Sequence, residues 1–185
     1  MRTLRLLMPV LLLLLAGCGE YGNVNQGQVI DYQHDTGVVT LIADSNYRDA
    51  ARPRFDVLPP VTTRTPENPQ EMGPAPEAGK LLRLDTNARK LVIFNSAANQ
   101  IQEVPYQEMG TAEACAAAPA VDRARKTITL CADHRTLMVS ATDELLALPL
   151  DTWKAGDEVR YYYKDPARAL RFMNITKTNL NKAGE

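Results

Sequence analysis

Few side chains in this 185-residue sequence could bind a transition metal through sulfur or nitrogen, since it has three cysteines and two histidines. Cys131 and His134 form a Cys-x-x-His motif, which could supply two ligands to zinc. A zinc site needs three or four protein ligands, and the other histidine, His34, falls in a predicted turn. We therefore predict no metal site.

No motif indicates a catalytic centre. The chain has no Gly-x-Ser-x-Gly, no His-Glu-x-x-His and no glycine-rich phosphate cradle. A Ser-His-Asp triad remains possible, because its residues come together in space and need no fixed spacing in the sequence. Four aspartates fall at strand ends or turns: Asp31, Asp35, Asp85 and Asp122. Paired carboxylates there could bind calcium or cleave a glycoside, but Asp is also a common turn residue. We assign no catalytic residue and favour a protein that is not an enzyme.

One cluster of aromatic residues lies near the end of the sequence: Trp153, Tyr161, Tyr162 and Tyr163. These side chains could form a stacking platform for a sugar or peptide, as on the ligand faces of small barrels. The alternative is a half-buried strand with Tyr161 and Tyr163 in the core and Tyr162 outside, because successive side chains on a strand alternate in direction. We favour the strand and keep the platform as a candidate site.

The N-terminal stretch has the pattern of an export signal. Arg2 and Arg5 precede an apolar run from Leu6 to Ala16, which is too short to span a bilayer as a helix. The sequence Leu15-Ala16-Gly17-Cys18 resembles the lipobox of bacterial lipoproteins. The resemblance implies that residues 1–17 are a signal peptide and that Cys18 carries a diacylglycerol and an N-acyl group.

The lipobox resemblance also implies a location. Two or three acyl chains on Cys18 would anchor the chain firmly, because a single chain binds a membrane only marginally. In Gram-negative lipoproteins an Asp after the lipidated Cys favours the inner membrane, and here that residue is Gly19. The expected address is therefore the outer membrane, facing the periplasm, with the lipid as the only covalent group and no other cofactor.

Cys115 and Cys131 remain as an even pair in what would be an oxidising compartment. Their spacing is far from Cys-x-x-Cys, and no haem-attachment motif is present. We predict a structural disulfide, with a redox dithiol as the alternative.

The charge balance argues against nucleic acid as a partner. Residues 1–17 contain two arginines and no acid, so without them the Lys+Arg count falls from 21 to 19 against 22 Asp+Glu, a formal net charge of −3. A nucleic-acid-binding domain usually shows a basic excess. The expected partners are the membrane, through the lipid, and another envelope protein.

Three segments share a hairpin pattern of an apolar strand, an Asp-containing turn and a β-branched strand. They are residues 28–44, 79–95 and 121–130. Residues 101–106 and 159–163 indicate further strands, while residues 111–118 and 144–150 favour short helices. These patterns predict a mainly β fold with one or two small antiparallel barrels or meanders, OB-like or SH3-like, and a short helix.

Seven prolines fall within residues 53–76, which we expect to form a long loop because proline cannot donate to a β-ladder. This loop could be a surface connection or a partner-binding arm, docked through Phe55, Val57 and Leu58. The predicted organisation is listed in chain order: signal peptide 1–17, lipid-anchored tether 18–27, β-rich domain 28–176 with possible subdomains 28–110 and 111–176, and flexible tail 177–185.

The lipobox, the segment Gly-Gln-Val-Ile-Asp-Tyr at 27–32 and Lys-Ala-Gly-Asp-Glu-Val at 154–159 resemble an uncharacterised family of bacterial outer-membrane lipoproteins. The resemblance implies no activity. We expect a lipid-anchored envelope protein with a non-enzymatic binding or structural role. The alternatives are a periplasmic enzyme with a dispersed Asp/His site and an accessory subunit of an envelope redox complex.

Overall fold

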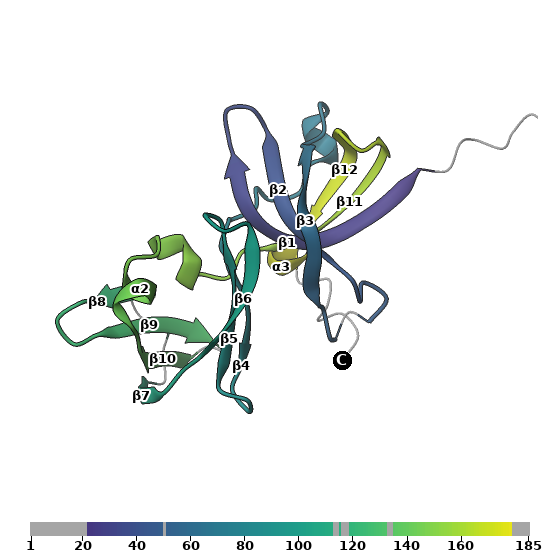
Figure 1. The fold of residues 1–185 in the computed structure, drawn as a ribbon. Helices are drawn as coiled ribbons and strands as arrows, with labels where there is room; N and C mark the ends of the chain where they lie inside the picture. Colours follow the sequence, from purple (N-terminus) through teal and green to yellow (C-terminus); the bar gives the residue numbers. More distant parts are fainter. Residues whose placement is uncertain (1–21, 50, 113–114, 116–118, 133–134, 179–185) are drawn as a thin grey trace, which may run out of the picture.

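The computed structural model describes residues 22–178 except residue 50 and residues 113–114, 116–118 and 133–134. Cys18, the signal peptide, His134 and most of the predicted tail lie outside the described residues. The described chain forms a β-barrel and a second β-rich body, here called the inserted lobe, which spans residues 80–154 (Figure 1). The mainly β prediction is confirmed.

The barrel has five strands that come from both ends of the chain. They are β1 (Asn23–Gln33), β2 (Val38–Asp44), β3 (Phe55–Arg64), β11 (Glu158–Asp165) and β12 (Arg168–Asn174). Their order around the barrel is β1-β2-β3-β12-β11, and β3 meets β12 in parallel at one pair, Arg64 with Arg168. This order, in which a single residue pair between β3 and β12 closes the barrel, is that of an OB-type barrel.

The first barrel strand occupies residues that we predicted to be tether. Residues 23–27 of the predicted tether 18–27 belong to β1 and pair with β11. The polar, glycine-rich composition suggested a linker, but Gln26 and Gln28 are buried because their amides donate to Glu158 and to the Leu81 carbonyl oxygen. The segment between Cys18 and the barrel is therefore shorter than predicted.

The proline-rich segment contains a barrel strand. We predicted a loop over residues 53–76, which is wrong for the ten residues of β3. Pro59 and Pro60 lie where the register between β2 and β3 shifts, and a bulge is one of the few places where a strand tolerates proline. After β3 the chain keeps its loop character, apart from the 3-10 helix η2 (Pro69–Glu71).

The inserted lobe leaves the barrel after β3 and returns before β11. It contains a three-stranded sheet, β4 (Leu81–Asp85), β5 (Lys90–Asn95) and β6 (Gln100–Pro105). Its second sheet has the order β7-β10-β9-β8, from β7 (Glu108–Ala112), β8 (Ala120–Asp122), β9 (Thr127–Ala132) and β10 (Arg135–Ser140). The short helices α2 (Asp143–Leu146) and η3 (Leu150–Trp153) follow, and α3 (Ile175–Thr178) ends the described chain after β12.

Three hairpins of the inserted lobe share one turn chemistry. Asp85, Asn95 and Asp122 each accept a hydrogen bond from a backbone N–H three residues later. The residue four positions after each of them has positive φ: Arg89, Asn99 and Lys126. Two of the three predicted hairpins, in 79–95 and 121–130, thus share one turn, and the hairpin after Asn95 has it as well.

Three apolar clusters form the core of the molecule. One fills the barrel, including Val29, Leu41, Val159, Tyr161 and Phe172. One lies between the two sheets of the inserted lobe, including Leu91, Ile93, Ile128, Leu130 and Trp153. The third, here called the interlobe surface, joins Ile30 and Ile42 of the barrel to Leu82, Val92 and Phe94.

The two faces of β5 explain its continuous apolar sequence. Leu91 and Ile93 enter the core of the inserted lobe, whereas Val92 and Phe94 pack on the barrel. Because alternate residues of a strand point to opposite faces, a strand covered on both sides needs apolar residues throughout. Burial on the interlobe surface therefore fixes the position of one lobe against the other.

Two details differ from the sequence prediction. The expected boundary between residues 110 and 111 falls inside β7, so it does not separate the two bodies. Thr111 and Ala112, at the start of the predicted helix 111–118, belong to the same strand. Among the residues that the structure describes, no helix is both long and apolar enough to cross a membrane.

Candidate functional site

A small groove lies between the barrel and the inserted lobe, and we call it the interlobe groove. Its cavity volume is about 130 Å³. The floor is apolar and comes from both bodies: Phe55, Leu82, Val92 and Ile101. The rim is polar and charged: Arg54, Asp56, Arg83 and Glu103, with Pro53 beside them.

Asp44, at the end of β2, positions one wall of the groove. Its carboxylate Oδ1 accepts hydrogen bonds from the backbone N–H groups of Asn46 and Arg54, at 2.8 and 2.7 Å. The Ser45 N–H also donates to the Arg54 carbonyl oxygen at 2.9 Å. These bonds close the β2–β3 loop and set the point from which Arg54 and Phe55 enter the groove.

The rim of the groove carries charges of both signs in close pairs. The Arg54 guanidinium lies 2.9 Å from the Asp56 carboxylate, and the Lys90 ammonium lies 2.8 Å from Glu103. The hydrogen bond from Lys90 lowers the pKa of Glu103. A general acid working near neutral pH would need a raised carboxyl pKa instead, so this rim is better suited to recognition than to proton transfer.

Two exposed apolar side chains follow the groove residues on β3. Val57 and Leu58 follow Phe55 on this strand and are both exposed. On the side away from β2, β3 pairs with another strand only at Arg64. The predicted docking residues Phe55, Val57 and Leu58 therefore do not all serve the core: Phe55 lines the groove, and the other two face solvent.

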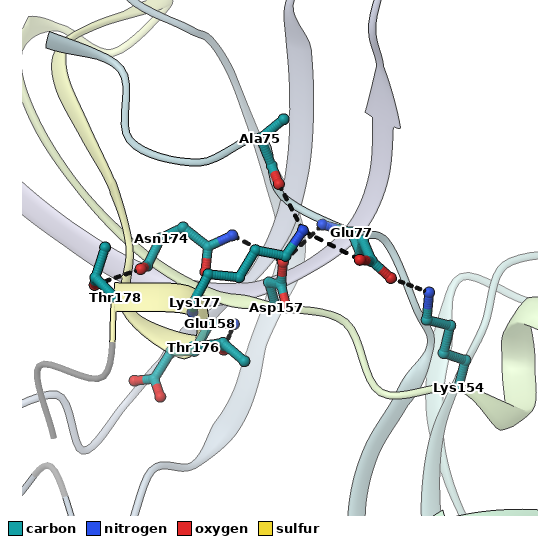
Figure 2. A network of polar contacts seen from close by, with 9 residues as sticks. All are labelled: Ala75, Glu77, Lys154, Asp157, Glu158, Asn174, Thr176, Lys177 and Thr178. Atoms are coloured by element: carbon teal, nitrogen blue, oxygen red, sulfur yellow. Dashed lines mark hydrogen bonds and ion pairs between the residues drawn. The ribbon is translucent and has the colours of Figure 1, made fainter. Parts of the chain in front are cut away.

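A polar network links the barrel to the inserted lobe where the chain leaves and re-enters the barrel (Figure 2). Lys154 of the inserted lobe pairs with Glu77, and Lys177 of α3 lies 3.1 Å from the same carboxylate. Asp157 is buried and accepts hydrogen bonds of 2.8 Å from the Asn174 amide and the Glu77 N–H. We call these five residues the junction network.

The charges of the junction network support one another. Hydrogen bonds from Lys154 and Lys177 lower the pKa of Glu77 from 4.5 to about 2. The hydrogen bond that Lys177 donates to Glu77 in turn raises the pKa of Lys177. Glu77 is thus ionised throughout the neutral range and holds the outgoing and returning segments side by side.

A second polar cluster lies on the outer face of the barrel. The Gln26 amide donates to Glu158 and to Asp44, and its oxygen accepts from Arg160 at 2.7 Å. Burial raises the pKa of Glu158, and the hydrogen bond from Gln26 opposes that rise. The cluster connects β1, β2 and β11, and through Asp44 it supports the loop that positions the groove.

A sequence comparison places the chain in a family. Residues 20–183 match the family described as a domain of unknown function (DUF4881). The chain belongs to the DUF4881 family. No curated protein and no solved structure matches it significantly. In this DUF4881 chain, the matched range covers both the barrel and the inserted lobe, which are therefore parts of one family domain.

The structure does not assemble the predicted aromatic platform in this DUF4881 chain. Trp153 is buried in the core of the inserted lobe, and Tyr161 is buried in the barrel. Tyr163 packs against the barrel core, and Tyr162 lies on the outer face with Gly22 against its ring. Tyr161 and Tyr163 share one face of β11, with ring centroids 5.4 Å apart, whereas Tyr162 lies on the other face and Trp153 lies in the other body. The four side chains therefore do not form the single surface that we predicted.

The predicted acids and His34 are also dispersed, and His134 lies outside the described residues. Asp85 and Asp122 cap turns, and exposed Asp31 and Asp35 lie around the β1–β2 hairpin. His34 is exposed and contacts the Tyr32 ring. Among the described residues, no group of three His, Cys, Asp or Glu side chains is placed to hold a metal ion.

The structure joins Cys115 to Cys131 in a disulfide, with a Cα–Cα distance of 5.2 Å. The bond links the β9 strand to the segment that follows β7. Sequence reasoning missed the interlobe groove, because its floor combines Phe55 from a proline-rich segment with β4, β5 and β6. The only local signal was the apolar run through both faces of β5.

Proposed function

We propose that this chain is a lipid-anchored envelope lipoprotein with a non-enzymatic binding role. Cys18 would carry the diacylglycerol and N-acyl groups, and Gly19 after it favours the outer membrane, facing the periplasm. The support for the anchor is the N-terminal sequence, in which two arginines, a short apolar run and small residues precede a cysteine.

The interlobe groove is the observation that carries the binding role. Its volume of about 130 Å³ is well below the roughly 300–1,000 Å³ of pockets that enclose drug-sized ligands. A water molecule takes up about 30 Å³ of liquid, so the groove has room for about four waters, or for one apolar side chain. This size suits an anchor residue of a protein partner better than a free metabolite.

The surroundings of the groove suit a protein surface as well. Val57 and Leu58 are exposed apolar side chains that follow the groove residue Phe55 on β3, while Arg54, Arg83 and Glu103 supply charges of both signs at the rim. Protein interfaces commonly combine a buried apolar centre with a polar rim. We therefore propose another envelope protein as the partner. It would contact the groove and the β3 strand, which lies in segment 53–76.

Site-specific photocrosslinking in cells tests this proposal. A photoreactive residue at Val57 or Leu58 should yield a discrete adduct with an envelope protein, identified by mass spectrometry. The control position is Met109 in β7, which is 56% exposed but lies in the inserted lobe away from the groove residues. Equal adducts from Val57 and Met109, or no adduct from either β3 position, would contradict the groove as the binding site.

A charge reversal at the rim sharpens the same experiment. Arg83→Glu changes the rim of the groove, and the expected result is a several-fold loss of the Val57 adduct. Arg125→Glu is the matched control, because Arg125 is exposed in the turn between β8 and β9 and does not line the groove. An unchanged adduct in Arg83→Glu would mean that the partner does not reach the groove.

A further inference from the structure

The barrel holds the start of the described chain at a fixed point. The Gly22 N–H donates to the Tyr162 hydroxyl at 2.9 Å. Gly22 lies so close to the Tyr162 ring that a Cβ atom added there would be 2.4 Å from ring carbon Cζ. A larger residue at position 22 would displace this contact, so the glycine allows the chain to cross the ring just before β1.

The distance from this point to Cys18 is short. Extended chain spans at most about 3.3–3.6 Å per residue, so the four residue steps from Gly22 to Cys18 cover about 14 Å at most. The strand pairing of β1 from Asn23 onward leaves no slack beyond this. If Cys18 is acylated, the barrel face around Tyr162 must lie within that distance of the acylated sulfur.

That face presents apolar side chains to solvent. Val24 is 58% exposed and lies opposite Tyr162 in the β1–β11 pairing. Leu170 is 45% exposed and, with Tyr162, lines a surface hollow beside Glu71 and Arg171. Tyrosine is enriched where proteins meet the membrane–water interface, and apolar side chains beside it gain from leaving water.

The charges next to this face are paired. The Arg171 guanidinium lies 2.6 Å from the Glu71 carboxylate, and Arg160 donates to Gln26 farther along β11. A close ion pair loses less on approaching a headgroup region than an isolated charge of either sign. The hollow beside Tyr162 can therefore face lipid headgroups without presenting an uncompensated charge.

We propose that Val24, Tyr162 and Leu170 form a membrane-contacting face, seated on the bilayer that holds the Cys18 lipid. This inference rests on the proposed lipid anchor. β1 begins on the side of the barrel away from the inserted lobe (Figure 1), so the inserted lobe points away from the membrane. The interlobe groove then stands at a set height above the bilayer, where a partner in the envelope would meet it.

Spin labels on the full lipidated protein test this orientation. Nitroxides are attached to Leu170→Cys and, as the matched control, to Met109→Cys in the inserted lobe, and the protein is placed in vesicles of phosphatidylethanolamine and phosphatidylglycerol. The label at position 170 should collide more often with lipid-soluble oxygen than with an aqueous nickel chelate. The label at position 109 should show the reverse order.

The outcomes separate the inference from the function on which it rests. Intact mass of the purified protein first shows whether Cys18 carries lipid, and an unlipidated protein overturns both. With lipid present, equal aqueous exposure of the two labels overturns only the membrane-contacting face. A label at position 170 that is shielded from both reagents in cell-derived membranes but not in vesicles would show a protein partner on this face, which also overturns the proposal.

A charge substitution provides the second measurement. Val24→Glu places a carboxylate on the proposed face, and it should raise the aqueous accessibility of the label at position 170 several-fold. The matched control is Gln107→Glu, which adds the same charge at an exposed position in the inserted lobe. An unchanged accessibility in Val24→Glu would contradict contact between this face and lipid.

Discussion

The barrel and the inserted lobe are built from the chain in different ways. The barrel takes β1–β3 from the N-terminal part and β11–β12 from the C-terminal part, and its seam closes at a single pair of residues, Arg64 and Arg168. In the inserted lobe, consecutive strands form antiparallel hairpins, except that β7 pairs with β10. Contacts between distant parts of a chain carry a larger loop-closure entropy than local hairpins.

This difference suggests a division of roles. The inserted lobe can form hairpin by hairpin, with a disulfide of its own. The barrel needs both ends of the chain, so it depends on the junction network and on the interlobe surface for closure. The proposed lipid tether leads into the barrel, and the proposed partner site lies where the two bodies meet.

The largest expected effect comes from truncating a buried side chain in one of the two cores at a time. Phe172→Ala removes a fully buried side chain of the barrel and should destabilise it by about 3–5 kcal/mol. Because the hairpins of the inserted lobe are local, hydrogen exchange should accelerate much more in β1, β2 and β11 than in β9 and β10. Peptide-resolved hydrogen exchange measures this difference.

Leu130→Ala is the counterpart in the inserted lobe, where Leu130 is also fully buried. It should destabilise that lobe by about 2–5 kcal/mol and leave the barrel strands better protected. Equal loss of protection in both bodies for either variant would show one cooperative unit and would contradict the proposed division.

The disulfide provides the next largest effect. It closes a loop with a sequence separation of 16, and in the chain-entropy model such a loop contributes about 3 kcal/mol. Replacing Cys115 and Cys131 by serine together should lower the unfolding free energy of the inserted lobe by this amount in denaturant titrations. A barrel that loses as much stability as the inserted lobe would argue against local stabilisation.

The junction should respond to a single added methyl group. A Cβ at Gly156 would lie 1.9 Å from the Val29 carbonyl oxygen, so Gly156→Ala must push the returning segment away from β1. Overpacking of this kind typically costs about 1–3 kcal/mol. Gly110→Ala is the control, because a Cβ there meets nothing within 4 Å. Similar melting temperatures for the two variants would mean that the junction yields without strain.

The smallest effect is a pH dependence of the junction. The folded-state pKa of Glu77 is about 2 against an ordinary 4.5, so its stabilising contribution is fully present above pH 4.5 and is lost as the pH falls toward 2. The Glu77 side chain is 53% exposed, which limits the gain to about 1 kcal/mol or less. Glu77→Gln should lack this loss in thermal melts, whereas Glu108→Gln, at an exposed position of the inserted lobe, should keep it.

Local features of the fold could be predicted from the sequence. The alternation of Val159, Tyr161 and Tyr163 predicted β11, with Tyr161 in the core and Tyr162 outside. The Asp-containing turns predicted hairpins because their side chains cap the turn backbone. The β6 strand also agrees with its weak alternation over residues 101–106.

Features that depend on distant partners could not be predicted. Gln26 and Gln28 belong to a linker-like sequence, and only their bonds to Glu158 and to the Leu81 carbonyl oxygen bury them in β1. Pro59 and Pro60 argue against a strand until the register shift against β2 accommodates them. The groove shares this property, since no short segment contains more than one side of it.

The central claim is that a lipid on Cys18 holds this two-lobed body at a bilayer. Its most direct test is the mass of the N-terminal peptide from the mature protein, purified from membranes of the producing bacterium. The expected peptide begins at Cys18 and carries a diacylglyceryl group and an amide-linked acyl chain. A peptide that begins at another residue, or that contains Cys18 without lipid, would contradict it.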